Sequence, residues 1–118
     1  MERLKRRQDF VAAAKGVYQP MPGFVMQALN RCDGEPARLG FTCTKKLGNA
    51  VMRNRIRRRL KEAARLCLTP ATKPGFDYVV IGRLAAENRP FQLLQSDLIS
   101  AVERLHTKAL NATQMSAQ

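Results

Sequence analysis

Apolar residues recur at helical intervals in the middle of the chain. Between Ala50 and Leu68 the apolar positions are spaced i, i+4, i+7, i+8 and i+11, at Ile56, Leu60, Ala63, Ala64 and Cys67. This spacing predicts an amphipathic helix with one buried face. Asn49 precedes the first helical residue and is a good N-cap.

Two further segments have helical patterns. Residues 6–15 predict a short helix that ends at Gly16, with Phe10, Val11 and Ala14 on one side. Phe91–Leu110 predict the last helix, although Ser96 and Asp97 could cap a fresh helix and divide this segment. Its expected buried face consists of Leu94, Leu98, Val102, Leu105 and Ala109.

The remaining apolar runs are short and typical of strands. Phe24–Leu29 and Leu39–Thr44 predict two strands paired with each other, and Asp77–Leu84 predict a buried strand. Prolines and glycines make Tyr18–Gly23 extended or irregular and Thr69–Gly75 a loop. The order helix, strands, helix, strand, helix implies a small sheet with helices packed on it. We expect one domain over residues 1–110 and a polar, disordered tail over 111–118.

The charge balance points to a polyanionic partner. Twenty-one Lys and Arg residues face nine Asp and Glu residues, which gives a formal charge of +12 and a pI near 10.7. Such a surplus destabilises a compact fold by self-repulsion unless an anionic partner relieves it. Nucleic acid is the first candidate partner and an anionic membrane surface is the second.

Several other classes of protein fit poorly. The sequence shows no secretory signal and no run of about 18 apolar residues, so we expect a soluble, cytoplasmic protein. Cys32, Cys43 and Cys67 lack the close spacing of zinc ligands. The carboxylates are scattered and His106 is the only histidine. We therefore expect no catalytic residue, no metal bound by the protein alone, and no small-molecule substrate.

Residues 45–65 concentrate positive charge. They hold nine of the basic residues and one acid, Glu62. On a helical wheel, Asn54, Arg58, Lys61 and Arg65 lie opposite Ile56, Arg55 and Arg57 lie on the flanks, and Arg53 and Arg59 lie near the apolar stripe. Like charges at i, i+4 each destabilise a helix by about 0.2–0.5 kcal/mol. A merely solvated face would contain interleaved acids, so this pattern favours contacts with phosphates and base edges.

The residues before this helix are a second feature. Lys45, Lys46 and Gly48 lead into the free backbone N–H groups of a helix N-terminus, which can bind a phosphate. A simple capped turn explains Gly48 and Asn49 equally well, and only the adjoining lysines favour the phosphate site.

The ordered segments Arg38–Thr42, Lys45–Val51 and Arg53–Arg58 resemble the signature of bacterial ribonuclease P proteins, with Arg53-Asn54-Arg55 as its hallmark. The resemblance covers roughly residues 4–108. It implies an α+β fold, a two-layer α/β sandwich of order αβββαβα, whose small mixed sheet contains a left-handed β-α-β crossover. That handedness is rare among parallel connections, and pattern alone does not predict it.

The resemblance also implies a function. Such proteins bind a large catalytic RNA and the single-stranded 5′ leader of precursor tRNA, while the RNA subunit, with magnesium that it mainly holds itself, hydrolyses the phosphodiester. The RNA-binding residues would then be Lys45, Lys46, Asn49, Arg53, Asn54, Arg55, Arg57, Arg58, Lys61 and Arg65. The leader cleft, between the first helix and the sheet, would contain Phe10, Phe24 and Lys46.

The chain departs from the family pattern at two positions near Phe10. Ala14 and Gln27 stand where relatives often have aromatic residues. We therefore expect a less aromatic cleft that depends more on charge. Phe10 itself has two interpretations, as a core residue or as a ring that stacks on a leader base.

Three other classes of function remain as alternatives. A ribosomal or other structural RNA-binding protein could have a similar basic helix. A DNA-binding module is disfavoured because strands, and no second helix, flank the basic segment. A membrane-surface helix is disfavoured because the apolar face is rich in alanine and lacks aromatic residues.

Overall fold

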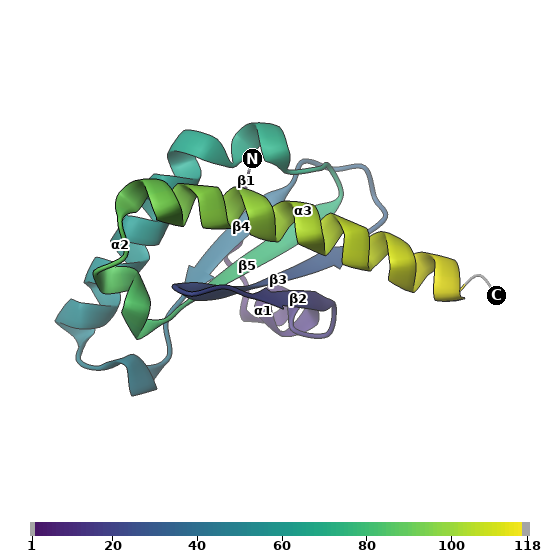
Figure 1. Ribbon diagram of the computed structural model, residues 1–118. Helices are drawn as coiled ribbons and strands as arrows, with labels where there is room; N and C mark the ends of the chain where they lie inside the picture. The colour runs from purple at the N-terminus through teal and green to yellow at the C-terminus, as the bar shows by residue number, and fades with distance from the viewer. Residues whose placement is uncertain (1, 117–118) are drawn as a thin grey trace.

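The computed structural model describes residues 2–116, which form a five-stranded mixed sheet and three α-helices (Figure 1). The strands are β1 (Glu2–Arg3), β2 (Val17–Pro20), β3 (Phe24–Asn30), β4 (Arg38–Thr42) and β5 (Phe76–Gly82). The helices are α1 (Arg7–Ala13), α2 (Ala50–Cys67) and α3 (Phe91–Ser116), with 3-10 turns at Lys45–Leu47, Thr69–Ala71 and Leu84–Glu87. After the two-residue β1, the element order is αβββαβα, as the resemblance implies.

The strand order is β1-β4-β5-β3-β2, which corrects one expectation. We expected the segments 24–29 and 39–44 to pair, but β5 lies between them, antiparallel to β3 and parallel to β4. β5 takes the centre because it is the strand buried along nearly its whole length. The parallel pair β4 and β5 is joined through α2, and the left hand of this crossover stays a prediction from the resemblance.

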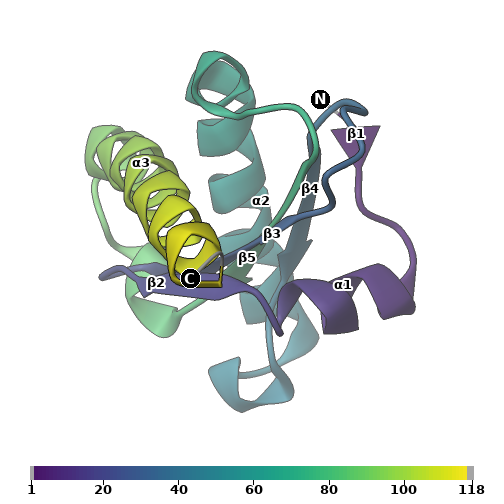
Figure 2. The ribbon, with the colours of Figure 1, turned by 90° about the vertical axis from the view of Figure 1, so that its right-hand side faces the viewer.

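The two faces of the sheet are covered unequally. In Figure 2, α2 and α3 lie on one side of the sheet and α1 on the other. The α2–α3 side holds the main core, to which the strands contribute Phe24, Met26, Tyr78 and Val80. The α1 side holds a small cluster around Leu4, Ala13 and Val79. Because α1 is only seven residues long, part of this second face lies open.

The long helices confirm the apolar stripes read from the sequence. α2 buries Ile56, Leu60, Ala63 and Ala64. α3 buries Leu94, Leu98, Val102 and Leu105.

The course of α3 corrects two boundaries. It is not divided at Ser96-Asp97, because the Asp97 carboxylate accepts a hydrogen bond from Arg89 Nε at 2.5 Å instead of capping a new helix. The helix also continues to Ser116, through most of the expected tail, while residues 117–118 lie outside the described part.

The first helix is shorter than expected and buries another face. Ala13 is fully buried, whereas Val11 is 51% exposed and Ala14 is exposed. The helix rests on the sheet through Phe10 and Ala13, which are three residues apart and so lie on one side. The expected grouping of Phe10, Val11 and Ala14 was therefore wrong for the last two residues.

A buried carboxylate connects α1 to one end of the sheet. Asp77 on β5 accepts hydrogen bonds from Arg38 Nε at 2.7 Å and from Arg31 Nη1 at 2.5 Å. Arg38 also forms an ion pair with Asp9 of α1 at 3.4 Å. Because Asp77 is only 1% exposed, its loss would leave two arginines without their shared partner.

We expect Asp77→Asn to lower the free energy of unfolding by about 3 kcal/mol, because Arg31 and Arg38 lose the buried carboxylate that they share and keep only their more exposed partners Asp33 and Asp9. Equilibrium unfolding in urea measures this change. Asp33→Asn is the matched control, since Asp33 also pairs with Arg31 but its side chain is 41% exposed; its loss should be below about 1 kcal/mol. Equal losses in both variants would contradict this role for Asp77.

His106 is part of the packing between α3 and β5. Its Nε2 lies 2.6 Å from the Tyr78 hydroxyl, and its ring packs against Phe76. The hydroxyl accepts the backbone N–H of Lys73 at 3.1 Å, so its proton is available for a neutral imidazole. Burial raises the pKa of Tyr78 to about 12. Burial lowers the pKa of His106 and the charge of Lys73 lowers it further, so the neutral ring is favoured.

The lowered pKa of His106 makes stability depend on pH. In the unfolded chain His106 takes up a proton near pH 6.5, and in the folded chain it does so only at a lower pH. The contribution of neutral His106 to the free energy of unfolding is therefore complete above pH 6.5, and it is lost as the pH falls through the pKa of the folded state. We expect His106→Gln to weaken the decrease in unfolding free energy between about pH 7 and pH 5. Urea unfolding at both pH values tests this, and parallel profiles for the variant and the unchanged protein would contradict it.

Candidate RNA interface

The start of α2 is built as the sequence suggested. The Asn49 side chain accepts the Met52 N–H at 2.9 Å, which confirms it as the N-cap. The preceding residues Lys45–Leu47 form a 3-10 turn, and Gly48 has a φ of 140°, which favours glycine. Lys45 and Lys46 are exposed on this turn, so both ammonium groups are available beside the helix start.

The basic side chains of α2 fall into two groups. Arg55 pairs with Glu87 at 2.8 Å and Arg65 pairs with Glu62 at 2.6 Å. The Arg65–Glu62 pair is exposed on both sides, so a phosphate can replace its carboxylate with little loss, whereas Arg55 is 54% accessible but its partner Glu87 is only 21% accessible. Arg59 donates to the backbone carbonyls of Ala86 and Arg89. Arg59 therefore anchors the 3-10 turn Leu84–Glu87 and is a structural arginine.

The second group lacks an acidic partner. Among the residues that the structure describes, no carboxylate pairs with Arg53, Arg57, Arg58 or Lys61. Nε of Arg53 and Nε of Arg57 are covered and have no hydrogen-bond acceptor. Burial lowers the pKa of Lys61, and the positive charges of Arg3 and Arg57 lower it further. The middle of α2 thus presents uncompensated positive charge.

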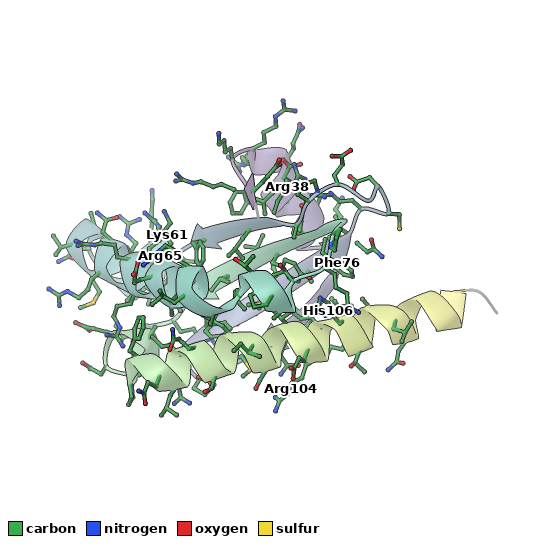
Figure 3. The ribbon with its side chains drawn as sticks, turned by 90° about the horizontal axis from the view of Figure 1, so that it is seen from above. Arg38, Lys61, Arg65, Phe76, Arg104 and His106 are labelled. Carbon is green, nitrogen blue, oxygen red and sulfur yellow. The ribbon has the colours of Figure 1, made fainter. Side chains whose placement is uncertain are left out.

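The acidic residues are concentrated elsewhere. Asp9, Asp33 and Asp77 pair with Arg31 and Arg38 at the far end of the sheet. Asp97 pairs with Arg89 at the start of α3. Figure 3 shows Lys61 and Arg65 together on α2, well away from Arg104 on the outer side of α3.

The open face beside α1 contains a hollow of about 540 Å³, which we call the α1 hollow. Its lining includes Lys5, Phe10, Ala14, Gln27, Phe41 and Ile81. The Phe10 ring lies against Gly40, where an added Cβ would approach the ring to 2.7 Å. Phe10 therefore packs on the sheet and also borders the hollow, and its stacking on a leader base stays a prediction.

Known proteins are similar to this chain in sequence and in fold. The family model Ribonuclease P matches residues 1–106. The chain belongs to the ribonuclease P protein family. The ribonuclease P protein component of Ruegeria pomeroyi is 49% identical over 106 residues, which cover 87% of this chain and 85% of the relative. That of Gluconacetobacter diazotrophicus is 52% identical over 97 residues, which cover 81% and 84%.

Solved structures of the family have the same fold. The RNase P protein from Thermotoga maritima aligns with a TM-score of 0.72 at 28% identity and covers 88% of this chain and 97% of its own. A Staphylococcus aureus RNase P protein mutant with defective mRNA degradation activity aligns with a TM-score of 0.71 at 31% identity, covering 86% and 85%.

The structure places two of the three expected leader-cleft residues, Phe24 and Lys46, outside the α1 hollow. Phe24 is 0% exposed and packs in the main core, on the face opposite α1. Side chains alternate along a strand, so burial of Phe24 and Met26 turns Gln27 toward α1. Lys46 lies on the turn before α2 and does not line the α1 hollow. Phe10 alone of the three expected cleft residues lines this hollow.

The α1 hollow also contains residues that sequence reasoning missed. Phe41, Thr42 and Ile81 line it from β4 and β5. Ala14 and Gln27 line it as well, so the missing aromatic side chains leave space in this hollow. The alternation of side chains along β4 and β5 shows which residues share a face of the sheet. The sequence does not show which of the two faces α1 covers, so these lining residues could not be identified from it.

The described residues show neither a metal-binding cluster nor a membrane-spanning helix. Among these side chains, no group of three or more histidine, cysteine, aspartate or glutamate residues could hold a metal ion. None of the helices there is long and apolar enough to span a membrane. Cys43 and Cys67 are free thiols whose pKa is raised by burial, so they behave as apolar residues.

The positions of the two phenylalanines predict different effects on stability. Phe24→Ala should lower the free energy of unfolding by about 3–5 kcal/mol, because it empties a fully buried site. Phe10→Ala should lower it by less than half of that, since Phe10 borders an open hollow and packs on one side only. Urea unfolding of both variants tests this contrast, and a larger loss for Phe10→Ala would show that it is a core residue.

Proposed function

We propose that this chain, the protein component of ribonuclease P, binds the catalytic RNA of that ribonucleoprotein through α2 and the turn before it. The proposed RNA-binding residues are Lys45, Lys46, Asn49, Arg53, Asn54, Arg55, Arg57, Arg58, Lys61 and Arg65. The α1 hollow takes the single-stranded 5′ leader of precursor tRNA. The holoenzyme then removes that leader in an endonucleolytic step.

One observation carries this proposal. Arg53, Arg57, Arg58 and Lys61 share one helix, and among the described residues none has a carboxylate partner. Guanidinium groups bind phosphate oxygens in a bidentate manner, and RNA supplies these at regular spacing. Bound phosphates would also remove the repulsion between neighbouring turns of α2.

The leader contacts follow from the chemistry of the α1 hollow. Lys5 and Phe10 place a cation and an aromatic ring at its border. Stacking of a base on an aromatic side chain contributes about 1–3 kcal/mol. With Ala14 and Gln27 in place of further rings, charge contributes a larger share of leader affinity in this chain.

The RNA and its magnesium carry out the hydrolysis. The described carboxylates and His106 do not form a magnesium site, because their side chains are not grouped. Several are also engaged elsewhere, since Asp77 and Asp97 bind arginines and His106 binds Tyr78. In this proposal the protein binds and orients RNA, and the proton transfers of the reaction fall to the RNA subunit.

The protein works in the cytoplasm without a small-molecule substrate. Its three free cysteines suit a reducing compartment. Its uncompensated charge faces RNA and not a membrane, because the apolar side of α2 is occupied by the core.

Reconstitution tests the proposal directly. The pure protein is mixed with a ribonuclease P RNA at low magnesium, and removal of the leader from a precursor tRNA is measured. We expect enhanced cleavage, with an RNA affinity that falls with salt at a log–log slope of roughly −4 to −5 for about six phosphate contacts. A structural RNA-binding protein of another kind would bind RNA without enhancing cleavage, and this outcome would overturn the proposal.

Substitution of single arginines tests the assigned surface. Arg58→Ala should weaken binding of the catalytic RNA and reduce the magnitude of the salt slope by about 1. Arg104→Ala is the control, because Arg104 is an exposed arginine on the outer side of α3 (Figure 3). The same affinity for both variants would contradict the assignment.

The protein by itself should hydrolyse neither precursor tRNA nor mRNA. Protein purified under denaturing conditions and refolded is freed of bound RNA, and it is then incubated with both substrates and magnesium. RNA cleavage by the refolded, RNA-free protein would show that the protein has a catalytic site of its own.

A further inference from the structure

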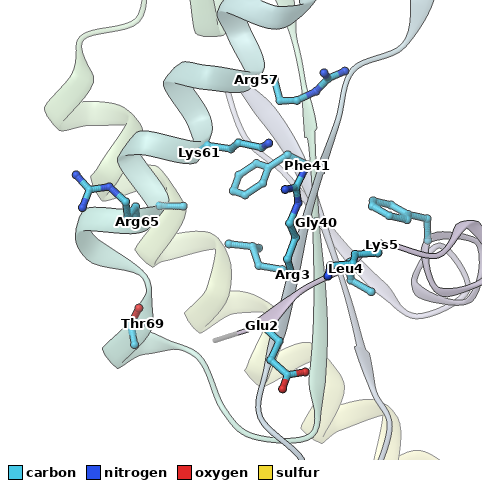
Figure 4. Close-up of a pocket in the computed structure, with 13 residues that line it drawn as sticks. Glu2, Arg3, Leu4, Lys5, Gly40, Phe41, Arg57, Lys61, Arg65 and Thr69 are labelled. Atoms are coloured by element: carbon cyan, nitrogen blue, oxygen red, sulfur yellow. The ribbon is translucent and has the colours of Figure 1, made fainter.

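A second hollow, of about 800 Å³, lies at the β4 edge of the sheet, between β1 and α2 (Figure 4). We call it the edge hollow. Its residues come from β1, β4 and α2, and it includes Arg3, Phe41, Arg57 and Lys61. Phe10 lines this hollow as well as the α1 hollow, so its ring stands between the two.

The N-terminal strand holds Arg3 at this place. The Glu2 N–H donates to the Ala37 carbonyl at 2.8 Å, and the Leu4 N–H donates to the Leu39 carbonyl at 3.1 Å. Leu4 is 4% exposed and belongs to the small core beside α1. Backbone pairing on both sides of Arg3, together with the buried Leu4, fixes the direction in which the Arg3 side chain leaves the strand.

The edge hollow is lined by five cationic residues, Arg3, Lys5, Arg57, Lys61 and Arg65, of which Arg65 pairs with Glu62. Arg3 and Lys61 point toward the space beside Phe41, and Arg57 lies one helical turn along α2 from Lys61 (Figure 4). Over the described residues, none of these last three cations pairs with a carboxylate, and the Glu2 side chain points away from them. Nε of Arg57 is covered without an acceptor, although Nη1 donates to Asn54 at 3.2 Å.

The mutual repulsion of these cations favours the binding of an anion between them. Burial and the charges of Arg3 and Arg57 lower the pKa of Lys61, so the folded chain holds these groups together at a free-energy cost. A covered guanidinium nitrogen without an acceptor also destabilises the free protein. One phosphate between these side chains would relieve the repulsion among the three cations.

Phe41 supplies the second part of the site. It lies on β4 next to Gly40, packs against the main core and also lines the edge hollow. An aromatic ring beside phosphate-binding cations is the usual combination for single-stranded nucleic acid, whose bases stack on the ring while cations bind the backbone. A base within a duplex is stacked on its neighbours and could not reach the ring.

We propose that the edge hollow binds one unpaired nucleotide of RNA, with its phosphate held by Arg3, Arg57 and Lys61 and its base against Phe41. The site rests on the proposed RNA-binding function and adds β1 and β4 to the interface formed by α2. Its volume lies within the range of small-ligand sites. The nucleotide comes from the catalytic RNA or from the precursor, and the shared chemistry is an unstacked base on a phosphodiester backbone.

The test uses the full chain with Arg3→Gln, Phe41→Leu and the control Arg104→Gln. Affinities for the catalytic RNA and for a single-stranded leader oligoribonucleotide are measured separately across a range of salt concentrations. Arg3→Gln should weaken binding of one of these RNAs severalfold and reduce the magnitude of its salt slope by about 1. Phe41→Leu should weaken the same binding about tenfold with an unchanged slope.

The RNA that responds identifies the source of the nucleotide. Phe41→Leu keeps an apolar side chain against the core, and thermal unfolding checks that the variant folds. If Phe41→Leu does not fold, the affinities of Arg3→Gln alone test the site, because Arg3 is exposed and its substitution leaves the core unchanged. Affinities equal to that of Arg104→Gln for both RNAs would overturn the proposed site.

A photo-crosslinking residue at position 41 in the assembled holoenzyme provides a second readout. The proposal predicts a crosslink to one nucleotide that is unpaired in its RNA. Crosslinks confined to paired nucleotides, or none at all, would count against the site. Failure of the RNA-binding function itself is recognisable, since the unchanged protein would then neither bind RNA nor enhance cleavage.

Discussion

The packing of α2 against the sheet decides where the positive charge of this molecule lies. Ile56 and Leu60 are almost completely buried, and the helix approaches so closely that a Cβ on Gly82 would lie 2.8 Å from the Ile56 side chain. A helix held along one stripe cannot rotate, so the remaining side chains have fixed directions. Arg58 therefore faces solvent, while Arg53 and Arg57 lie half-covered at the border of the core. The apolar contact comes first, and the electrostatic surface follows from it.

The distribution of acids leaves the surface of α2 positively charged, which supports the proposed RNA interface. Asp9, Asp33 and Asp77 neutralise arginines at one end of the sheet, where they connect the strands to α1. Among the described residues, only Glu62 and Glu87 pair with basic side chains of α2, and in both pairs the arginine side chain is more than half accessible. The ion pairs that stabilise the fold therefore lie at one end of the sheet, apart from the unpaired cations of α2. The free chain tolerates the repulsion on α2 because the apolar face of this helix is well packed, and the proposed RNA partner would relieve it.

Phe10 lies between the α1 hollow and the edge hollow. Its ring covers Gly40, where a larger residue would not fit, and it borders the α1 hollow on one side and the edge hollow on the other. Phe41 lines both hollows as well. Single-stranded RNA in one hollow would thus lie within reach of RNA in the other, with aromatic rings between them. In a chain that has Ala14 and Gln27 beside α1, Phe41 supplies aromatic surface that those positions lack.

The sequence by itself determined the local features: the extent of α2, its Asn49 cap, its buried stripe and the excess of cations on its other faces. These depend on residues within a few turns of each other, so spacing and residue type suffice to predict them. Only the tertiary structure decided that β5 separates β3 from β4, that Phe24 lies inside, and that Arg55 meets Glu87 while Arg59 binds backbone carbonyls. Strand order, the covered face of a strand and the partner of a distant side chain depend on contacts between residues far apart in the chain. No local period records such contacts, and for this reason Arg3 joined the candidate interface only when β1 was found beside β4.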